Sequence, residues 1–144
     1  MFIGQYEHKL EERGRISIPK RFRSELSEGG VLTRGLDGCL FLFSRKRWQE
    51  FIERLAQIPL TKAEARGFSR FLTYGAVEVE LDSQGRILLP EFLRNFAGIK
   101  KEVILAGAIG RIEIWDKENF NAYQEKIEKE GEKIAERLNE LGIL

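Results

Sequence analysis

The sequence contains few of the residues from which catalytic and metal sites are built. Its 144 residues include one cysteine, Cys39, and one histidine, His8. A single cysteine cannot form an intramolecular disulfide, and one cysteine with one histidine does not make a usual zinc site. The apolar neighbours 40–43 favour a buried thiol over a nucleophile, and His8 is expected at the surface or packed on a strand. No Ser-His-Asp set and no P-loop glycine pattern are present. We therefore expect no enzyme, no cofactor, no metal and no small-molecule substrate.

Long apolar runs are also missing. The longest, 38–43 and 103–109, are far shorter than the ~20 residues that a membrane helix needs. The N-terminus lacks a basic segment followed by an apolar core. Charged residues make up 33% and hydrophobic residues 42% of the chain. These proportions are typical of a folded domain, so we predict a cytoplasmic protein without a membrane partner.

What the chain does contain is an internal repeat. The segment 10–19, LEERGRISIP, recurs 71 residues later at 81–90 as LDSQGRILLP. An acidic residue, a glycine, an arginine and a proline recur in register, and Arg23 is matched by Arg94. A chance match at so many positions is improbable. The sequence therefore indicates a tandem duplication.

Each copy of the repeat describes a turn followed by a strand. A polar triplet closed by glycine reverses the chain, because glycine adopts positive φ without a Cβ clash. An apolar strand follows, and its proline suits the first turn of a helix. The acid and the arginine lie four residues apart, as Glu11 and Arg15 in the first copy and Asp82 and Arg86 in the second. We expect each pair to form a charge-assisted hydrogen bond that fixes the guanidinium for recognition.

The charge of the two halves differs although the whole chain is nearly neutral at +1. Residues 1–72 hold 14 basic against 9 acidic residues, a net of +5, and residues 73–144 hold 10 against 14, a net of −4. The first motif is the most basic part, with Lys9, Arg13, Arg15, Lys20, Arg21 and Arg23. Only the first copy is therefore predicted to meet an anion. A charge cluster of this kind is otherwise more often a solvated face.

The periodicity of apolar residues predicts a mixed α+β chain. Strands are expected at 2–10, 31–34, 39–43, 77–81, 103–106 and 111–115. Short helices are expected at 20–26 and 91–97, and longer ones at 45–57, 61–74 and 117–141. Ser44, Thr61 in a capping box with Glu64, and Asp116 are the expected N-caps of the longer helices. We interpret five aromatic residues as packing residues of the core, namely Trp48, Phe51, Phe68, Phe71 and Trp115.

Neither copy is large enough to stand alone. Each has about 45 residues of strand, turn and short helix, too few to enclose a core. The strand edges of one copy are therefore expected to pair with the other in one intertwined barrel. We divide the chain into a first repeat with its helix, 1–57, a helical connector, 58–75, and a second repeat with a C-terminal helix, 76–144. The apolar stripe of that last helix is expected to dock on its own domain, with Gly131 marking a kink or a close contact.

The opening residues 1–8, MFIGQYEH, together with the GRISIP and GRILLP cores, resemble the MraZ family of bacterial proteins. The resemblance covers nearly the whole chain and implies a tandem-duplicated swapped-hairpin β-barrel, similar to AbrB-type DNA binders, with flanking helices. The family signature Asp-x-x-x-Arg falls on Glu11 and Arg15 and on Asp82 and Arg86, and the first copy departs from it by carrying glutamate. The resemblance further implies a nucleoid-associated transcriptional regulator, mainly a repressor, that acts on its own promoter ahead of cell-division and cell-wall genes. It also implies a ring-shaped homo-oligomer that binds repeated DNA boxes.

The basic motif fits that implication. Phosphate contacts by Lys9, Arg13, Lys20 and Arg21 would give affinity without sequence preference. Arg15 is the first candidate to read guanine, and Arg13 the second. For Asp82 and Arg86 we prefer a structural role. The alternative function is a ring-forming scaffold for protein partners in cell division, which would lack the steep salt dependence of DNA binding; an AbrB-type antitoxin is less favoured, because no disordered toxin-binding tail follows the repeats.

Overall fold

The computed structural model describes all residues, 1–144, and confirms an α+β fold built from two similar halves. The first half supplies β1 (Gln5–Lys9), β2 (Arg15–Ser17), β3 (Gly30–Arg34) and β4 (Leu40–Ser44). The second half supplies β5 (Val77–Val79), β6 (Arg86–Leu88), β7 (Glu102–Gly107) and β8 (Ile112–Asp116). Each repeat thus contributes four strands in the same order.

Each of the two sheets contains strands from both halves. One sheet has the order β1-β7-β8-β4-β3-β5 and a second contains only β2 and β6, with every pair antiparallel. β1 of the first half therefore pairs with β7 of the second, and β5 of the second half pairs with β3 of the first. This exchange confirms the expected intertwined barrel, because each half closes the strand edges of the other.

The main core lies between the large sheet and the β2–β6 ribbon. It contains 18 buried residues, among them Ile16 and Ile87 from the ribbon and Leu32 and Leu105 from the sheet. A smaller cluster around Cys39 and Trp115 covers another part of the sheet, and the Cys39 side chain is fully buried as predicted. Because both repeats contribute to the main core, neither half has a core of its own.

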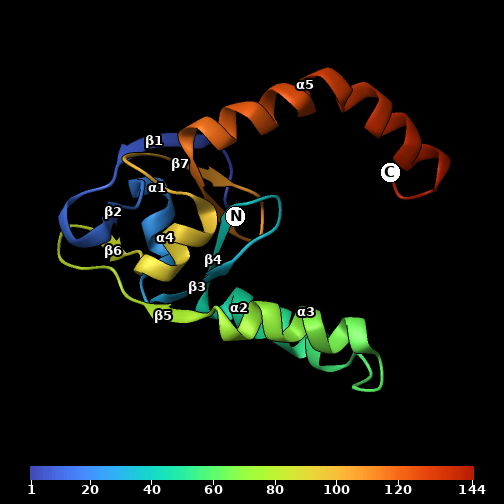
Figure 1. The fold of residues 1–144 in the computed structure, drawn as a ribbon, viewed down its shortest axis with the longest axis horizontal. Coiled ribbons are helices and arrows are strands. Elements are labelled where there is room, and N and C mark those ends of the chain that lie inside the picture. Colours follow the sequence, from blue (N-terminus) through green and yellow to red (C-terminus); the bar gives the residue numbers. More distant parts are fainter.

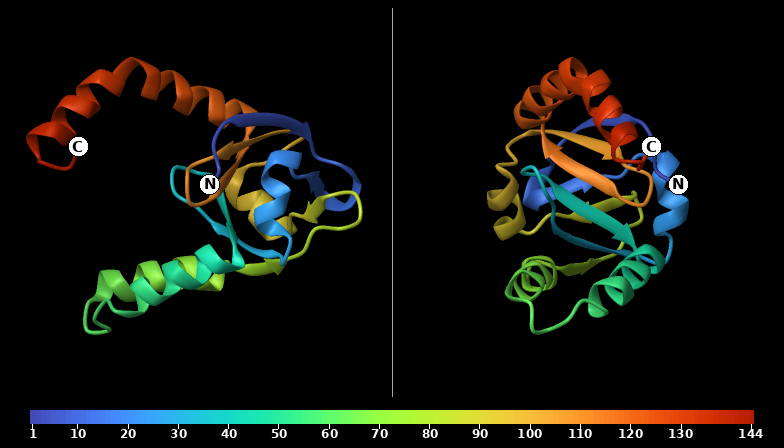
Figure 2. Two further views of the ribbon diagram at one scale, coloured as in Figure 1. Left: turned by 180° about the vertical axis from the view of Figure 1, so that it is seen from behind. Right: turned by 90° about the vertical axis from the view of Figure 1, so that its right-hand side faces the viewer.

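Five α-helices accompany the strands. Two short ones, α1 (Lys20–Arg23) and α4 (Glu91–Ala97), follow the motif prolines, and 3-10 turns are present at η1 (Glu12–Gly14) and η2 (Ser24–Leu26). The longer helices are α2 (Arg45–Ala56), α3 (Ala63–Tyr74) and α5 (Lys117–Glu140). Figures 1 and 2 show α2 and α3 running side by side as a hairpin, with α5 on the opposite flank of the barrel. These two arms project from one side of the barrel, and the β2–β6 ribbon lies at the other. The predicted division of the chain into segments 1–57, 58–75 and 76–144 remains a prediction. No helix is both long and apolar enough to cross a bilayer.

Two of the three expected N-caps are present. The Ser44 side chain accepts a hydrogen bond from the Arg47 amide at 3.2 Å, and Asp116 accepts one from the Asn119 amide at 3.4 Å. The capping box at Thr61 is wrong, because α3 begins at Ala63 after Lys62, which makes no side-chain cap. The Lys62 amide donates to the Pro59 carbonyl at 3.1 Å, so Thr61 lies inside a turn that precedes the helix.

The expected docking of the last helix is wrong for its second half. Phe120 is buried and Ile127 half-buried, but Ile134 and Leu141 are 39% and 64% exposed. At about 1.5 Å per residue, the 24 residues of α5 span about 36 Å and extend beyond the strands that they cover. Gly131 lies within a continuous helix, and no atom lies within 4 Å of the position that a Cβ would take, so the predicted close contact is wrong. Among the expected packing aromatics, Trp115 is 3% exposed whereas Phe68 is 37% exposed on α3.

Candidate nucleic-acid interface

The β2–β6 ribbon brings the two motif copies together on one surface. Ile16 pairs with Ile87, and both side chains are buried in the core. Side chains alternate across a strand, so the flanking positions of the ribbon point outward. This outer face carries Arg15 opposite Leu88 and Ser17 opposite Arg86. The ribbon therefore presents two arginines, one hydroxyl and one leucine to solvent, half of them from each repeat.

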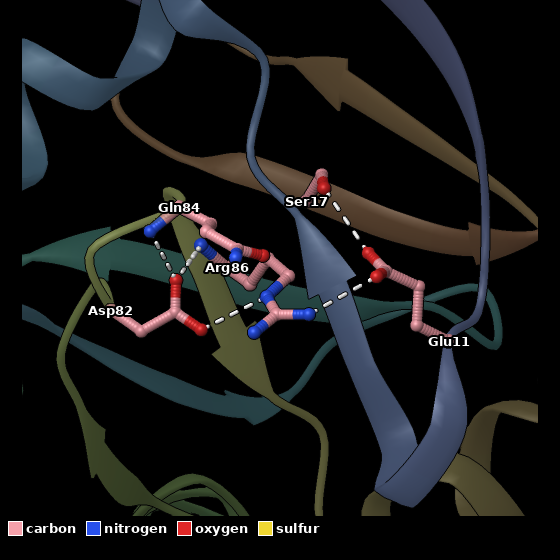
Figure 3. Close-up of polar contacts among 5 residues, drawn as sticks. All are labelled: Glu11, Ser17, Asp82, Gln84 and Arg86. Carbon is pink, nitrogen blue, oxygen red and sulfur yellow. Dashed lines mark hydrogen bonds and ion pairs between the residues drawn. The ribbon is translucent and has the colours of Figure 1, made fainter.

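In the second copy, the turn is closed by Asp82. Its Oδ1 accepts hydrogen bonds from the backbone amides of Gln84 at 2.8 Å and Arg86 at 2.9 Å, and its Oδ2 accepts from Arg86 Nε at 2.9 Å (Figure 3). The amide of Arg86 is the main cause that lowers the pKa of Asp82, and the bond to Asp82 raises the pKa of Arg86. The expected acid-arginine contact is thus present in this copy, and it holds both the turn and the guanidinium.

In the first copy, the expected contact between Glu11 and Arg15 is not formed. Glu11 Oε1 instead accepts from Arg86 Nη1 at 3.2 Å, and Glu11 Oε2 accepts from the Ser17 hydroxyl at 3.2 Å (Figure 3). The Glu11 side chain is one methylene longer than that of an aspartate, and its carboxylate accepts no hydrogen bond from the backbone amides of its own turn. That turn is a 3-10 turn in which Arg13 has a φ of 64°. Its carboxylate therefore reaches across the ribbon, and Arg86 is shared between the acids of both copies.

This arrangement leaves the basic residues of the first motif without acidic partners. Arg13 and Arg15 form no ion pair and no side-chain hydrogen bond. A surface groove of about 530 Å³ is lined by Leu10, Glu11, Glu12, Arg13, Arg15 and Arg86. Arg86 is bonded to two carboxylates, so Arg13 and Arg15 are the two arginines of this groove that have no acidic partner.

The repeated glycine and the repeated arginine interlock the two copies. Arg23 Nε donates to the Ile18 carbonyl at 2.7 Å, and Arg94 Nε donates to the Leu89 carbonyl at 2.9 Å. Each guanidinium covers the motif glycine of the other repeat: a Cβ at Gly85 would overlap Arg23, and a Cβ at Gly14 would lie 3.1 Å from Arg94 Nε. Arg23, expected among the DNA-contacting residues, is thus half-buried and used to join the repeats.

The other expected DNA-contacting residues lie exposed around the ribbon. Lys9 ends β1, and Lys20 and Arg21 begin α1 directly after β2. Lys100 and Lys101 lie beside Lys9, and sequence reasoning did not single them out because they belong to the acidic half of the chain. The Leu10 amide donates to the Lys101 carbonyl at 2.7 Å, and a groove of about 270 Å³ is lined by Lys9, Lys100, Lys101, Glu102, Asp116, Lys117 and Glu118. The adjacent Lys-Lys pair at the start of a strand was the only signal in the sequence.

The two flanks of the ribbon differ in charge. β1 carries Lys9 toward the ribbon, whereas the corresponding strand of the second copy, β5, carries Glu78 and precedes Glu80. Arg45 lies 3.5 Å from Glu78 and 4.0 Å from Glu80. The face is therefore basic on the side of the first motif and close to neutral on the other. No group of three or more His, Cys, Asp and Glu side chains lies close enough to hold a metal ion.

Comparison with known proteins agrees with this architecture. The family model described as "MraZ protein, putative antitoxin-like" matches residues 1–71 and again residues 72–141. The chain is 49% identical over 143 residues to a protein named transcriptional regulator MraZ from Caldanaerobacter subterraneus subsp. tengcongensis, which covers 99% of this chain and 100% of that relative. It is 49% and 47% identical, with the same coverage, to proteins of the same name from Thermoanaerobacter pseudethanolicus and Caldicellulosiruptor saccharolyticus. The resemblance read from the motifs is confirmed. The chain therefore belongs to the MraZ family.

Proposed function

We propose that this protein is a sequence-specific DNA-binding transcriptional regulator that reads base pairs with the outer face of the β2–β6 ribbon. The observation that carries the proposal is Arg15, which lies on that face without an acidic partner. The major groove of B-DNA admits a two-stranded β-ribbon, and an arginine is the commonest bidentate partner of guanine O6 and N7. The names of the relatives, transcriptional regulators, support the same function.

The proposed division of labour follows from position and charge. Arg15 reads guanine, and its cross-strand neighbour Leu88, which is 51% exposed, offers an apolar contact to a thymine methyl group. Arg13 is the second candidate for a base. Exposed Lys9, Lys20 and Arg21 contact phosphates and contribute affinity that falls with salt.

The Asp82–Arg86 pair is assigned a supporting role. Arg86 donates to both Asp82 and Glu11, so a base could recruit its guanidinium only by breaking charge-assisted bonds. These bonds join the two turns across the ribbon and hold its outer face in one shape. We therefore assign Arg86 to joining the two turns, and it does not read bases itself.

The target and the assembly rest on the family resemblance. We infer that the protein binds repeated boxes in its own promoter, on the nucleoid, and mainly represses the cell-division and cell-wall genes that follow. A ring-shaped homo-oligomer presents several ribbons to linked boxes. Once one ribbon is bound, each further contact is intramolecular, so weak single contacts add up to tight binding.

A scaffold that acts through protein partners in cell division is the second candidate. The exposed apolar residues on the outer half of α5 favour it, because they offer a surface for protein rather than for DNA. Salt dependence separates the two functions. Neutralising several phosphates makes DNA affinity fall steeply as salt rises, whereas an apolar protein contact changes little.

The test is a binding titration against the DNA upstream of the protein's own gene, at two salt concentrations, with the mass of the oligomer measured in parallel. The variants are Arg15→Ala and, as its equivalent in the second copy, Arg86→Ala. We expect Arg15→Ala to lose specific binding with assembly intact, and Arg86→Ala to keep most of it. Wild type without salt-sensitive binding, or two variants that bind like wild type, would refute the proposal and favour the scaffold.

A further inference from the structure

The outer half of α5 carries an apolar stripe that its own barrel does not cover. We define the outer α5 segment as residues 128–144. Ile134, Leu138 and Leu141 are spaced i, i+4 and i+7 and so share one helix face, and Ile143 and Leu144 follow the end of the helix. Ile134 is 39% exposed, and Leu141, Ile143 and Leu144 are 64%, 69% and 75% exposed. An isolated helix of this length is marginally stable in water, so a partner surface that buries the stripe would stabilise it.

The α2–α3 hairpin carries a second uncovered apolar surface. At its tip, a cleft of about 150 Å³ is lined by Leu55, Ala56, Ile58, Pro59, Leu60, Ala65, Arg66, Ser69 and Arg70. Leu60 and Ile58 are 81% and 42% exposed. A cleft of apolar side chains with an arginine rim is suited to an amphipathic helix that presents anchors at i, i+4 and i+7.

The charges of these two surfaces are opposite. Residues 45–75 contain seven basic and three acidic side chains, a net of +4. The outer α5 segment contains five acidic and three basic side chains, a net of −2. Complementary charge steers association and disfavours the pairing of two like surfaces. Each surface therefore fits the other better than it fits itself.

The two surfaces do not meet within one chain. Figures 1 and 2 show α5 and the α2–α3 hairpin leaving the barrel on opposite flanks, each pointing away from the ribbon. We propose that the outer α5 segment of one copy docks on the tip of the α2–α3 hairpin of a second copy. This inference rests on the proposed self-assembly and names the contact that produces it.

A contact between two different surfaces has a consequence for the assembly. Every copy carries one of each, so a bound copy still offers a free hairpin at one end and a free α5 at the other. Such a head-to-tail contact adds one copy after another. The chain of copies closes into a ring when a whole number of rotations between neighbours makes up 360°. The arms lie opposite the ribbon, so the contact leaves the proposed DNA-reading face open.

Two complementary variants of the full chain test the contact. The hairpin variant Leu60→Asp/Arg70→Glu removes the cleft side, and the helix variant Leu138→Asp/Leu141→Asp removes the stripe. Alone, each is expected as a monomer of 16.7 kDa by light scattering. Mixed in equal amounts, they retain one intact hairpin and one intact helix, so we expect a complex of twice that mass and nothing larger. Phe92→Asp, at a half-exposed apolar position on α4, is the matched control and keeps the wild-type mass.

The inference is overturned if either variant keeps the wild-type mass, or if the mixture stays monomeric while wild type assembles. Circular dichroism verifies that the variants are folded. The milder variants Leu60→Ala and Leu141→Ala introduce no charge, and each must also lower the assembled fraction. The DNA titration separates this inference from the proposed function. Wild type that binds its promoter but gives no complementing mixture refutes the contact alone, and wild type that assembles without binding DNA refutes the function alone.

Discussion

Replacing Gly85 with alanine tests the interlock between the two repeats. Gly85 has a φ of 75°, and a Cβ there would overlap the guanidinium of Arg23. The left-handed backbone costs alanine about 1–2 kcal/mol. Displacing Arg23 also breaks its bond to the Ile18 carbonyl, and a hydrogen bond to a charged group contributes about 1.5–3 kcal/mol. We therefore expect Gly85→Ala to lower the free energy of unfolding by about 2.5–5 kcal/mol.

The assay is thermal unfolding at one fixed protein concentration. With about 2.1 cal/mol/K of unfolding entropy per residue, 144 residues give about 0.3 kcal/mol/K, so Tm should fall by about 8–17 °C. Gly38→Ala is the matched control, because Gly38 has a φ of 85° and no atom within 4 Å of its would-be Cβ. Only the backbone cost applies there, which corresponds to about 3–7 °C.

A double-mutant cycle identifies Arg23 as the cause. In an Arg23→Ala background the overlap is absent, so Gly85→Ala should cost no more than Gly38→Ala costs in wild type. If Gly85→Ala is as mild as Gly38→Ala, or equally damaging with and without Arg23, the interlock does not hold the repeats together as described.

Three further predictions concern the ribbon and its surroundings. Leu88→Ala should reduce the preference for thymine over deoxyuridine at one position of each box by about tenfold or less, which competition binding with substituted probes measures; equal discrimination by both proteins would argue against the methyl contact. The pKa of Asp82 is lowered on folding, so its stabilising contribution is complete above its ordinary value of 3.8 and is lost as pH falls through the lower folded value. Urea unfolding should accordingly find wild type more stable than Asp82→Asn at pH 7 and the difference shrinking below about pH 4; a difference that grows on acidification would contradict this assignment. Lys100→Ala/Lys101→Ala should flatten the plot of log affinity against log salt by up to about 2 without changing sequence preference, and an unchanged slope would remove both residues from the phosphate contacts.

The local elements were predictable because their causes lie within a few residues. Tyr6 and His8 are half-buried and Glu7 between them is exposed, which is the alternation of the strand predicted at 2–10. Asp82 closes its own turn through amides two and four residues away, a contact encoded by the motif itself. The intertwined barrel also followed, because two units too small for a core must share one.

The contacts across the repeats were not predictable in the same way. Glu11 was assigned to Arg15, four residues away, yet it bonds Arg86, which is 75 residues away. The choice depends on the ribbon register that places Ser17 opposite Arg86, and no local spacing encodes that register. Lys101 was overlooked for a related reason, since it comes to the first motif only through the pairing of β1 with β7, which the bond from the Leu10 amide to the Lys101 carbonyl extends.

The sequence by itself determined the duplication, the strands and turns of each copy, the excess of basic residues in the first motif and the family. All of these are properties of short segments or of their repetition. Tertiary structure decided which acid holds which arginine, that Arg23 braces the other repeat while Arg13 and Arg15 remain without acidic partners, and that the outer half of α5 leaves the barrel. The physical reason is that hydrogen bonds and burial depend on which distant segments the sheet register places side by side, and pairing across two similar repeats offers partners that sequence spacing cannot rank.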